Sequence, residues 1–317
     1  MMDSMTRSRT VTLAIANQKG GVAKTTSVAS IGAALVELGH SVLIVDLDPQ
    51  ACLTFSLGID PEDVELSVHH VLTKGLDPTE AIIETADGVD LLPATIELAR
   101  AEADLLTRTG REHVIKSAIE SLAEDEVHYD WVLLDCPPSL GVLTVAALTA
   151  ADGVLIPLQC ETLSHRGVGQ LLDTVHDVRR FTNRKLEVWG VLPTLYDGRT
   201  NHSRTVLETI SDTYDLEVVE PPIPKTIKFA EAPAAGRSIL STSRSSKGAQ
   251  AYREVAANLV KRAERPKARK VASDTAAQKK TAQKKTAQKR TAQKRTAQTA
   301  ASPKATKAPK ATKAPKA

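Results

Sequence analysis

A stretch near the amino terminus carries the residue types that bind phosphate: Asn17-Gln18-Lys19-Gly20-Gly21-Val22-Ala23-Lys24-Thr25-Thr26. Glycines allow backbone amides to turn toward an anion, and the dipole of a following helix adds positive charge. In such a loop Lys24 would reach the β- and γ-phosphates of a nucleotide, and the Thr25 hydroxyl would ligate Mg²⁺. The strict G-x-x-x-x-G-K-[ST] pattern fails, because Gln18 and Ala23 stand where its two glycines belong. A second lysine, Lys19, precedes the glycine pair instead.

The flanking sequence predicts the two elements that would position this loop. Residues 11–16 are apolar and β-branched, which is typical of a buried strand, and residues 27–38 repeat apolar side chains at helical spacing. A strand, a glycine-bearing loop and a helix start, in that order, form an anion cradle. The alternative, a glycine turn with two solvated lysines, leaves both flanking elements unexplained.

Carboxylates follow two further predicted strands. The strand over residues 41–45 ends in Asp46-Leu47-Asp48-Pro49-Gln50, and the strand over residues 129–134 ends in Asp135-Cys136-Pro137-Pro138-Ser139. Side chains at the carboxyl ends of parallel strands point into the crevice where doubly wound α/β sheets bind ligands. Asp135 is therefore placed to hold a metal through its water shell. A single aspartate of this kind would more often be a turn or cap residue, but three such strand ends occur here in order.

The whole chain predicts an α/β fold with a doubly wound, mostly parallel sheet and helices on both faces. Further strands are expected at residues 89–93, 153–157 and 186–192. Short helices are expected at residues 68–72 and 79–83, and longer ones at residues 98–106, 112–122, 142–150, 167–181, 203–213 and 247–262.

Composition divides the 317 residues into three parts. Residues 1–10 are polar and expected to be flexible, residues 11–264 to form one α/β domain, and residues 265–317 to be a disordered Lys/Ala/Thr/Pro-rich tail. The net charge of +3 hides a strong asymmetry: residues 266–317 carry 16 basic and one acidic side chain, which leaves 25 basic and 37 acidic before them. Such a tail suits DNA phosphates. A tail that only improves solubility is the alternative.

Cysteine usage and hydropathy favour a cytoplasmic protein. Cys52, Cys136 and Cys160 lie far apart without metal-ligand spacing, so thiols in a reducing compartment are expected. No apolar run reaches the roughly 18 residues that a membrane span needs, and the amino terminus lacks the apolar core of a signal peptide. We therefore expect no membrane partner.

Taken together, the three motifs resemble those of the deviant Walker-A ATPases, and within them the ParA group of partition ATPases. Later stretches agree with the resemblance, which covers about residues 11–263: Pro193-Thr194-Leu195-Tyr196-Asp197-Gly198-Arg199-Thr200-Asn201, Ile223-Pro224-Lys225 and Glu231-Ala232-Pro233. The resemblance implies a P-loop NTPase fold with ATP and Mg²⁺ as cofactors. It implies nucleotide contacts from Gly20, Gly21, Val22, Ala23, Lys24, Thr25, Thr26, Pro193 and Thr194, and a metal shell from Thr25, Asp46 and Asp135.

The resemblance also implies catalytic roles for Lys19, Lys24 and Asp48. In the family, the lysine equivalent to Lys19 crosses a dimer interface and contacts the phosphates of the partner's nucleotide, so that ATP joins two chains and hydrolysis separates them. Asp48 would orient the attacking water, with Asp46 supporting the metal shell or the switch. A surface lysine and a turn aspartate are the plainer alternatives.

The implied partners are non-specific DNA, a second copy of the chain in the ATP state, and a ParB-like centromere-binding protein that stimulates a weak ATP hydrolase. By position, Arg199, Lys225 and Lys228 match the family's DNA-binding residues, although an arginine is more usual at Lys225. Location on the nucleoid, within the cytoplasm, follows. An ATPase that positions another cargo, such as a protein microcompartment or chemosensory cluster, stays open. A MinD-like membrane ATPase lacks its amphipathic C-terminal helix here, and a nitrogenase-like iron protein lacks its cysteine ligands.

Overall fold

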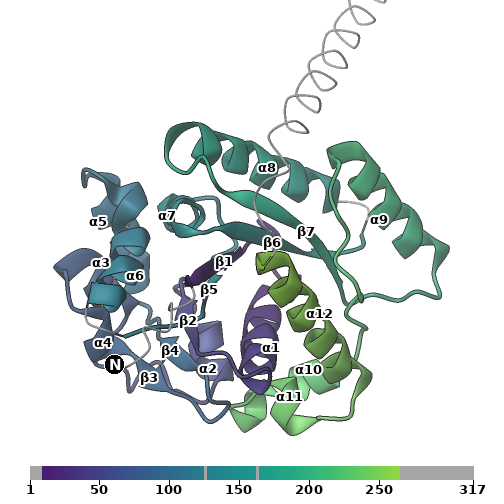
Figure 1. The fold of residues 1–317 in the computed structure, drawn as a ribbon, viewed down its shortest axis with the longest axis horizontal. Helices are drawn as coiled ribbons and strands as arrows, with labels where there is room; N and C mark the ends of the chain where they lie inside the picture. Colours follow the sequence, from purple (N-terminus) through teal and green to yellow (C-terminus); the bar gives the residue numbers. More distant parts are fainter. Residues whose placement is uncertain (1–8, 125–126, 162–163, 265–317) are drawn as a thin grey trace, which may run out of the picture. The chain divides into compact units, whose positions relative to one another are not determined.

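The computed structural model describes residues 9–124, 127–161 and 164–264. Its centre is a seven-stranded sheet in the order β3-β4-β2-β5-β1-β6-β7, parallel except for β3, which runs antiparallel to β4 (Figure 1). The strands are β1 (Val11–Ile15), β2 (Val42–Asp46), β3 (Ile83–Glu84), β4 (Asp90–Leu92), β5 (Trp131–Asp135), β6 (Gly153–Gln159) and β7 (Glu187–Thr194). The predicted α/β class with a mostly parallel sheet is confirmed.

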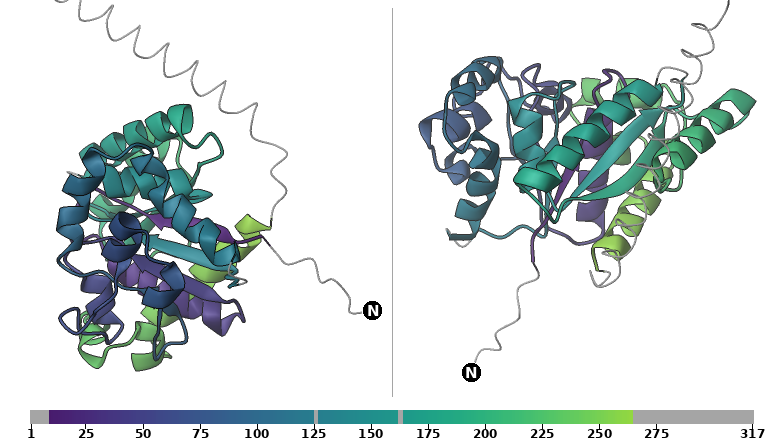
Figure 2. Two further views of the ribbon diagram at one scale, coloured as in Figure 1. Left: turned by 90° about the vertical axis from the view of Figure 1, so that its left-hand side faces the viewer. Right: turned by 90° about the horizontal axis from the view of Figure 1, so that it is seen from above.

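Helices cover both faces of this sheet (Figures 1 and 2). They are α1 (Lys24–Glu37), α2 (Cys52–Ser56), α3 (Val68–Lys74), α4 (Pro78–Ala81), α5 (Leu98–Leu106), α6 (Val114–Glu124), α7 (Val142–Ala150), α8 (Ser164–Phe181), α9 (Asn201–Tyr214), α10 (Lys228–Glu231), α11 (Ile239–Thr242) and α12 (Lys247–Ala263). Two 3₁₀ turns, η1 (Arg111–His113) and η2 (Pro233–Ala235), complete the described elements.

The strands are continuous apolar runs because both of their faces are buried. Side chains alternate between two cores: Leu13 and Ile15 of β1 pack with α1 and α12, whereas Ala14 faces the core formed with α7 and α8. The central strands β2 and β5 are buried at every position. Each fully buried aliphatic side chain contributes roughly 1.5–3 kcal/mol, so these strands fix the frame from which the loops project.

The strand and helix predictions are borne out for most elements, with differences where tertiary context decides. The helix expected over residues 142–150 is α7, with the same bounds. The helix expected over residues 79–83 is wrong at its end, since α4 stops at Ala81 and Ile83 begins β3, paired with β4. α10, η2 and α11 were not predicted, because such short turns carry little periodic signal.

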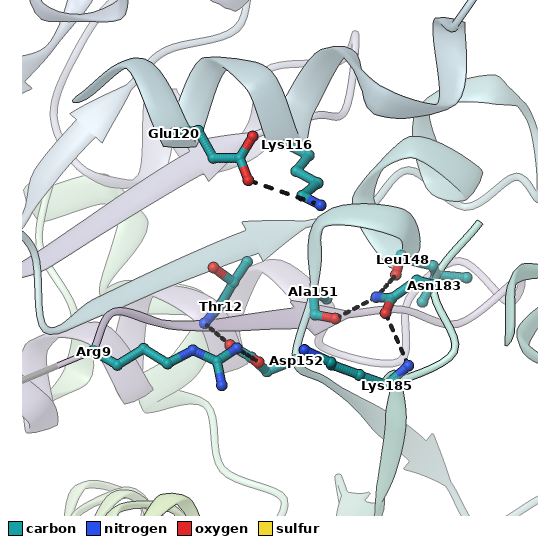
Figure 3. A network of polar contacts seen from close by, with 9 residues as sticks. All are labelled: Arg9, Thr12, Lys116, Glu120, Leu148, Ala151, Asp152, Asn183 and Lys185. Carbon is teal, nitrogen blue, oxygen red and sulfur yellow. Dashed lines mark hydrogen bonds and ion pairs between the residues drawn. The ribbon is translucent and has the colours of Figure 1, made fainter. Parts of the chain in front are cut away.

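At the amino ends of the central strands, polar groups form a paired network (Figure 3). Asp152 accepts a hydrogen bond from the backbone amide of Thr12 at 3.1 Å and forms an ion pair with Arg9. Nearby, the Asn183 side-chain amide donates to the carbonyls of Leu148 (3.1 Å) and Ala151 (2.7 Å). These contacts tie the start of β1 to the turn that leads into β6.

No helix among the described residues is long and apolar enough to cross a membrane. The predicted disordered tail over residues 265–317, and residues 1–8 of the segment 1–10 that was expected to be flexible, lie outside the described residues.

Candidate nucleotide-binding site

The loop between β1 and α1 has the backbone of an anion cradle. Gly21 has φ +73° and Ala23, the residue before α1, has φ 62°, so the chain turns through left-handed conformations twice. A Cβ atom placed on Gly20 or Gly21 would meet nothing within 4 Å, which means that the space in front of the loop is open. The loop therefore exposes its backbone to a ligand rather than packing it against protein.

The start of α1 has no side-chain cap, whereas the starts of α4 and α9 do. At α4 the Asp77 side chain accepts from the Thr79 amide at 2.9 Å, and at α9 the Thr200 hydroxyl accepts from the Ser203 amide at 3.3 Å. α1 has no side-chain cap and no acidic residue in its first turn. Its orphan amides and its positive dipole end thus face the open space beside the loop, where an anion is stabilised.

Two buried side chains fasten the loop to distant strands. Asn17 donates from Nδ2 to the carbonyl of Pro157 on β6 at 2.7 Å and accepts from the Lys19 amide at 3.0 Å. On the other flank, the Thr194 hydroxyl at the end of β7 donates to the Val22 carbonyl at 2.9 Å. The predicted nucleotide contact Thr194 therefore supports the loop, beside Pro193, whose carbonyl accepts from the backbone of residue 223 at 2.7 Å.

The two loop lysines lie in different surroundings. Lys24 is 7% exposed, and its Nζ lies 3.5 Å from the carbonyl of Lys19. The Lys19 side chain is 34% exposed, and its Nζ forms an ion pair of 2.5 Å with Glu161, which follows β6. One lysine thus points into the site and the other lies at its rim.

Two carboxylates oppose each other at the carboxyl ends of adjacent strands. Asp46 on β2 and Asp135 on β5 are direct register partners, and both are buried. Asp46 accepts from the amide and hydroxyl of Thr54 (3.0 and 2.8 Å) and from the amide of Asp48 (3.1 Å). Neither carboxylate oxygen of Asp135 meets a donor within hydrogen-bond distance and angle, although the Thr25 hydroxyl is near enough to lower the pKa of Asp135. The site thus combines one satisfied and one unsatisfied carboxylate.

Burial disfavours negative charge on both groups. It raises the pKa of Asp46 to about 6, against the lowering effect of the hydrogen bonds from Thr54 and Asp48. The pKa of Asp135 lies well above its usual range, chiefly because of burial and then because of the Asp46 charge, while the Thr25 hydroxyl and Lys24 oppose the shift. A cation bound at this position would stabilise the negatively charged form of both carboxylates.

Asp48 begins a tight turn in front of the buried pair. It is half-buried, its Oδ1 accepts from the Gln50 amide at 3.0 Å, and its carbonyl accepts from the Ala51 amide at 2.9 Å. Behind it, the Thr54 hydroxyl also accepts from the Ala94 amide at 3.0 Å. This chain of bonds holds the segment after β2 relative to β4, so Asp48 is presented from a fixed turn.

The donor set fits magnesium bound together with a phosphorylated ligand. Among the described residues, no cluster of three or more His, Cys, Asp or Glu side chains could hold a metal alone. Mg²⁺ in nucleotide sites takes one or two protein oxygens and completes its shell with phosphate and water. The orphaned oxygens of Asp135 and the half-buried hydroxyl of Thr25 fit that requirement.

The three predicted DNA-binding residues are exposed and lie on neighbouring segments. Arg199 sits in the turn before α9, where its amide donates to Asp197 Oδ1 at 3.1 Å. The Lys225 amide donates to the Tyr196 carbonyl at 3.4 Å, which brings its segment beside that turn. Lys228 begins α10 and pairs with Glu231 at 2.8 Å.

Four site residues had no role in the sequence analysis: Asn17, Thr54, Glu161 and Tyr252, whose hydroxyl lies 2.9 Å from Ser27 of α1. For Asn17, Glu161 and Tyr252, one contact each joins residues 140 or more apart in sequence, so local patterns hold no signal for it. Thr54 lies eight residues after Asp46, in the short helix α2 that follows the strand-end aspartate. This short spacing could have indicated their contact.

Comparison with known proteins gives consistent matches. A family model described as an AAA domain matches residues 10–188. Sporulation initiation inhibitor protein Soj of Bacillus subtilis is 43% identical over 251 residues, which cover 78% of this chain and 98% of that protein. Chromosome-partitioning ATPase Soj of Thermus thermophilus is 40% identical over 258 residues, or 81% of this chain and 98% of that protein.

Solved structures agree in fold and sequence. A crystal structure of cobyrinic acid a,c-diamide synthase from Mycobacterium smegmatis, with bound ADP and magnesium, is 56% identical. It superposes with a TM-score of 0.71 and covers 80% of this chain and 94% of that chain. A second structure of the same protein holds an ATP analogue and magnesium.

Proposed function

The chain belongs to the family of ParA- and Soj-type partition ATPases, and from that premise we propose an ATPase that dimerises on binding ATP and acts on DNA. One observation carries this proposal. A buried aspartate with two unpartnered oxygens, Asp135, lies beside Lys24 and Thr25 at the uncapped start of α1. This arrangement suits a triphosphate and its cation. The ligands of the 56% identical structure, ADP and magnesium, support it.

In this proposal each group of the site has a separate task. The amides of residues 20–26 hold the phosphates, and Lys24 neutralises charge that develops on the transferred phosphoryl group. Thr25 and Asp135 hold magnesium, directly and through water. When bound, magnesium neutralises the β- and γ-phosphate oxygens and orients them. Asp46 fixes the turn that carries Asp48, and Asp48 orients the attacking water.

We further propose that Lys19 acts across a two-chain interface. It lies at the rim of the site rather than inside it, and Lys24 already supplies the internal positive charge. A rim lysine can reach phosphates held by a second chain, as an arginine finger does in trans. ATP would then be part of the contact between the chains, and hydrolysis would separate them.

The partners follow from charge and from the family. Arg199, Lys225 and Lys228 are exposed and close in the fold, which suits sequence-independent phosphate contacts. Residues 265–317, proposed as a separate basic segment beyond the ATPase domain of residues 11–264, would add to DNA affinity by counterion release. A ParB-like protein would stimulate hydrolysis, and the cytoplasmic nucleoid would be the place of action. Positioning of another cargo is the alternative.

A second candidate function is an ATP-dependent amide synthase, favoured by the name of the 56% identical structure. Amide formation from a carboxylate requires activation, which phosphoryl transfer supplies, and it also requires a corrin site and a nitrogen donor. A pocket of about 380 Å³ is lined by residues of α3, α4 and α6, of the segment after α3 and of the turn before η1, and by none of the loop that precedes α1. The two functions separate in one assay, because a synthase releases ADP only with a corrin acid and ammonia or glutamine.

The main proposal is tested by sedimentation with ADP, ATP and a slowly hydrolysed ATP analogue, each with Mg²⁺. The native chain should form dimers with ATP and the analogue but not with ADP, and Lys19→Ala should stay monomeric while still binding nucleotide. Salt-sensitive DNA binding should accompany the dimer. Monomers under all conditions would refute the dimer mechanism, and corrin-dependent ADP release would favour the synthase.

A further inference from the structure

Lys19, the lysine to which we assign a role across the dimer interface, forms an ion pair with Glu161. Its Nζ–Oε2 distance is 2.5 Å, with side-chain exposures of 34% for Lys19 and 52% for Glu161. Both residues belong to the same chain. A lysine bound in this way is not available to the nucleotide of a second chain until the pair opens.

One strand sets the geometry of this pair. The backbone of Lys19 is fixed through Asn17, which is bound to the Pro157 carbonyl on β6. Glu161 follows the same strand, and its amide donates to the Gln159 carbonyl at 2.8 Å. Asn17 thus fastens the loop that carries Lys19 to β6, the strand that leads to Glu161.

The other loop lysine cannot replace Lys19 in this pair. Lys24 is buried, and its charge opposes the raised pKa of Asp135, so it is engaged with the interior carboxylates. Glu161 thus acts on one lysine alone, and opening the pair changes the rim of the site while leaving the interior as it is.

We propose that Glu161 is a positioning residue that holds Lys19 within its own chain and so opposes ATP-dependent dimerisation. This inference rests on the proposed function of Lys19. On dimerisation Lys19 exchanges the Glu161 carboxylate for phosphate oxygens of the partner's nucleotide, and two such pairs open in a symmetric dimer. An exposed ion pair changes an equilibrium by up to about fivefold, so two pairs shift the dimer dissociation constant by about three- to twentyfold.

The decisive variant is Glu161→Gln, which keeps the size of the side chain and removes its charge. With the slowly hydrolysed ATP analogue and Mg²⁺, its dimer dissociation constant should fall about three- to twentyfold below that of the native chain, measured by sedimentation. The difference should shrink in 1 M salt, because the native pair is screened. Glu217→Gln is the matched control, since it removes the exposed carboxylate of another ion pair, with Arg262 at 2.6 Å, and should leave dimerisation unchanged.

A double-mutant cycle separates this role from a general structural one. Nucleotide affinity of the monomer, measured with Lys19→Ala, should be the same with and without Glu161→Gln. Equal or weaker dimerisation of Glu161→Gln, while the native chain dimerises normally, would overturn the inference and leave the proposed function intact. If the native chain itself never dimerises with nucleotide, both fall together.

Discussion

The two ends of the sheet place an aspartate in opposite surroundings, half-buried at one end and fully buried at the other. At the amino ends of the strands, Asp152 is bound by the Thr12 amide and by Arg9, and nothing is left for a ligand to satisfy (Figure 3). At the carboxyl ends, Asp135 is more deeply buried and has no hydrogen-bond partner at either oxygen. Burying an unpaired carboxylate costs free energy. Asp152 therefore stabilises the fold, whereas the oxygens of Asp135 are available to a cation.

The largest expected effect comes from making the same change at both ends. Asp135→Asn should raise the free energy of unfolding of the nucleotide-free protein by about 1–3 kcal/mol, because it removes a carboxyl group whose ionisation is disfavoured by burial and by the Asp46 charge. It should also lower Mg²⁺-dependent ATP turnover by about 100-fold or more. Asp152→Asn should lower stability by about 1 kcal/mol and leave turnover of the folded protein unchanged. Denaturant unfolding and steady-state ATP hydrolysis measure both.

If Asp135→Asn is as destabilising as Asp152→Asn, the contrast between the two ends is wrong. Both substitutions replace aspartate by the isosteric asparagine. If one raises the free energy of unfolding and the other lowers it, the difference cannot come from side-chain volume.

The pH dependence of the nucleotide-free protein sharpens the contrast. The folded-state pKa of Asp46 is raised by burial to about 6, from an ordinary value near 4. Its contribution to stability is therefore fully present below about pH 4 and is lost as the pH rises through about 6. The native chain should gain about 2 kcal/mol relative to Asp46→Asn when the pH falls from 7.5 to 4.5, measured by denaturant midpoints. Parallel profiles of the two proteins would mean that Asp46 is not strained.

A smaller effect should follow from Asp48→Ala, which removes the carboxylate of the turn but neither member of the buried pair. ATP turnover should fall about 10- to 100-fold, because the attacking water loses its base or orienting group. The ATP-dependent dimer should persist, since binding groups are unchanged. Single-turnover hydrolysis alongside sedimentation provides the check, and unaltered turnover would remove Asp48 from catalysis.

The smallest effect should come from Thr54→Val, which leaves the shape of the side chain nearly unchanged. It removes the hydroxyl that donates to Asp46 at 2.8 Å and accepts from the Ala94 amide at 3.0 Å. Stability should fall by about 1–2 kcal/mol, because a buried acceptor and a buried donor each lose a partner. Thermal unfolding measures this, with Thr79→Val as the control, since the half-buried Thr79 hydroxyl donates to Asp77 at the start of α4. A loss no greater than that of the control would show that the Thr54 network is dispensable.

The fold and the outline of the site could be predicted because their signals are local. Apolar runs and helical spacing located the strands and α7, and the loop residues of the site are contiguous in sequence. The partners of those residues could not be predicted. Asn17 meets Pro157 and Thr194 meets Val22 only after the sheet has formed, across 140 and 172 positions of sequence. No spacing rule connects residues whose proximity depends on strand order.

The hydrogen bonds that Asp46 accepts could also not be predicted from the sequence. Asp46 and Asp135 look alike there, each a strand-end aspartate, and both were assigned to the metal shell. The structure distinguishes them, because Thr54 lies opposite one of them alone. Asp46 is thus better placed to hold the Asp48 turn than to meet a cation directly, a proposal that the pH comparison above also addresses.

The attachment of the phosphate loop on both flanks has a consequence for how fast the protein can work. Asn17 ties one side of the loop to β6 and Thr194 ties the other side to β7, and both bonds join groups of the protein itself. The entropy of shaping the loop is therefore lost once, during folding, and not again at each binding event. Spent nucleotide can leave and fresh nucleotide can enter a receptor that keeps its form, so exchange is not delayed by rebuilding the backbone.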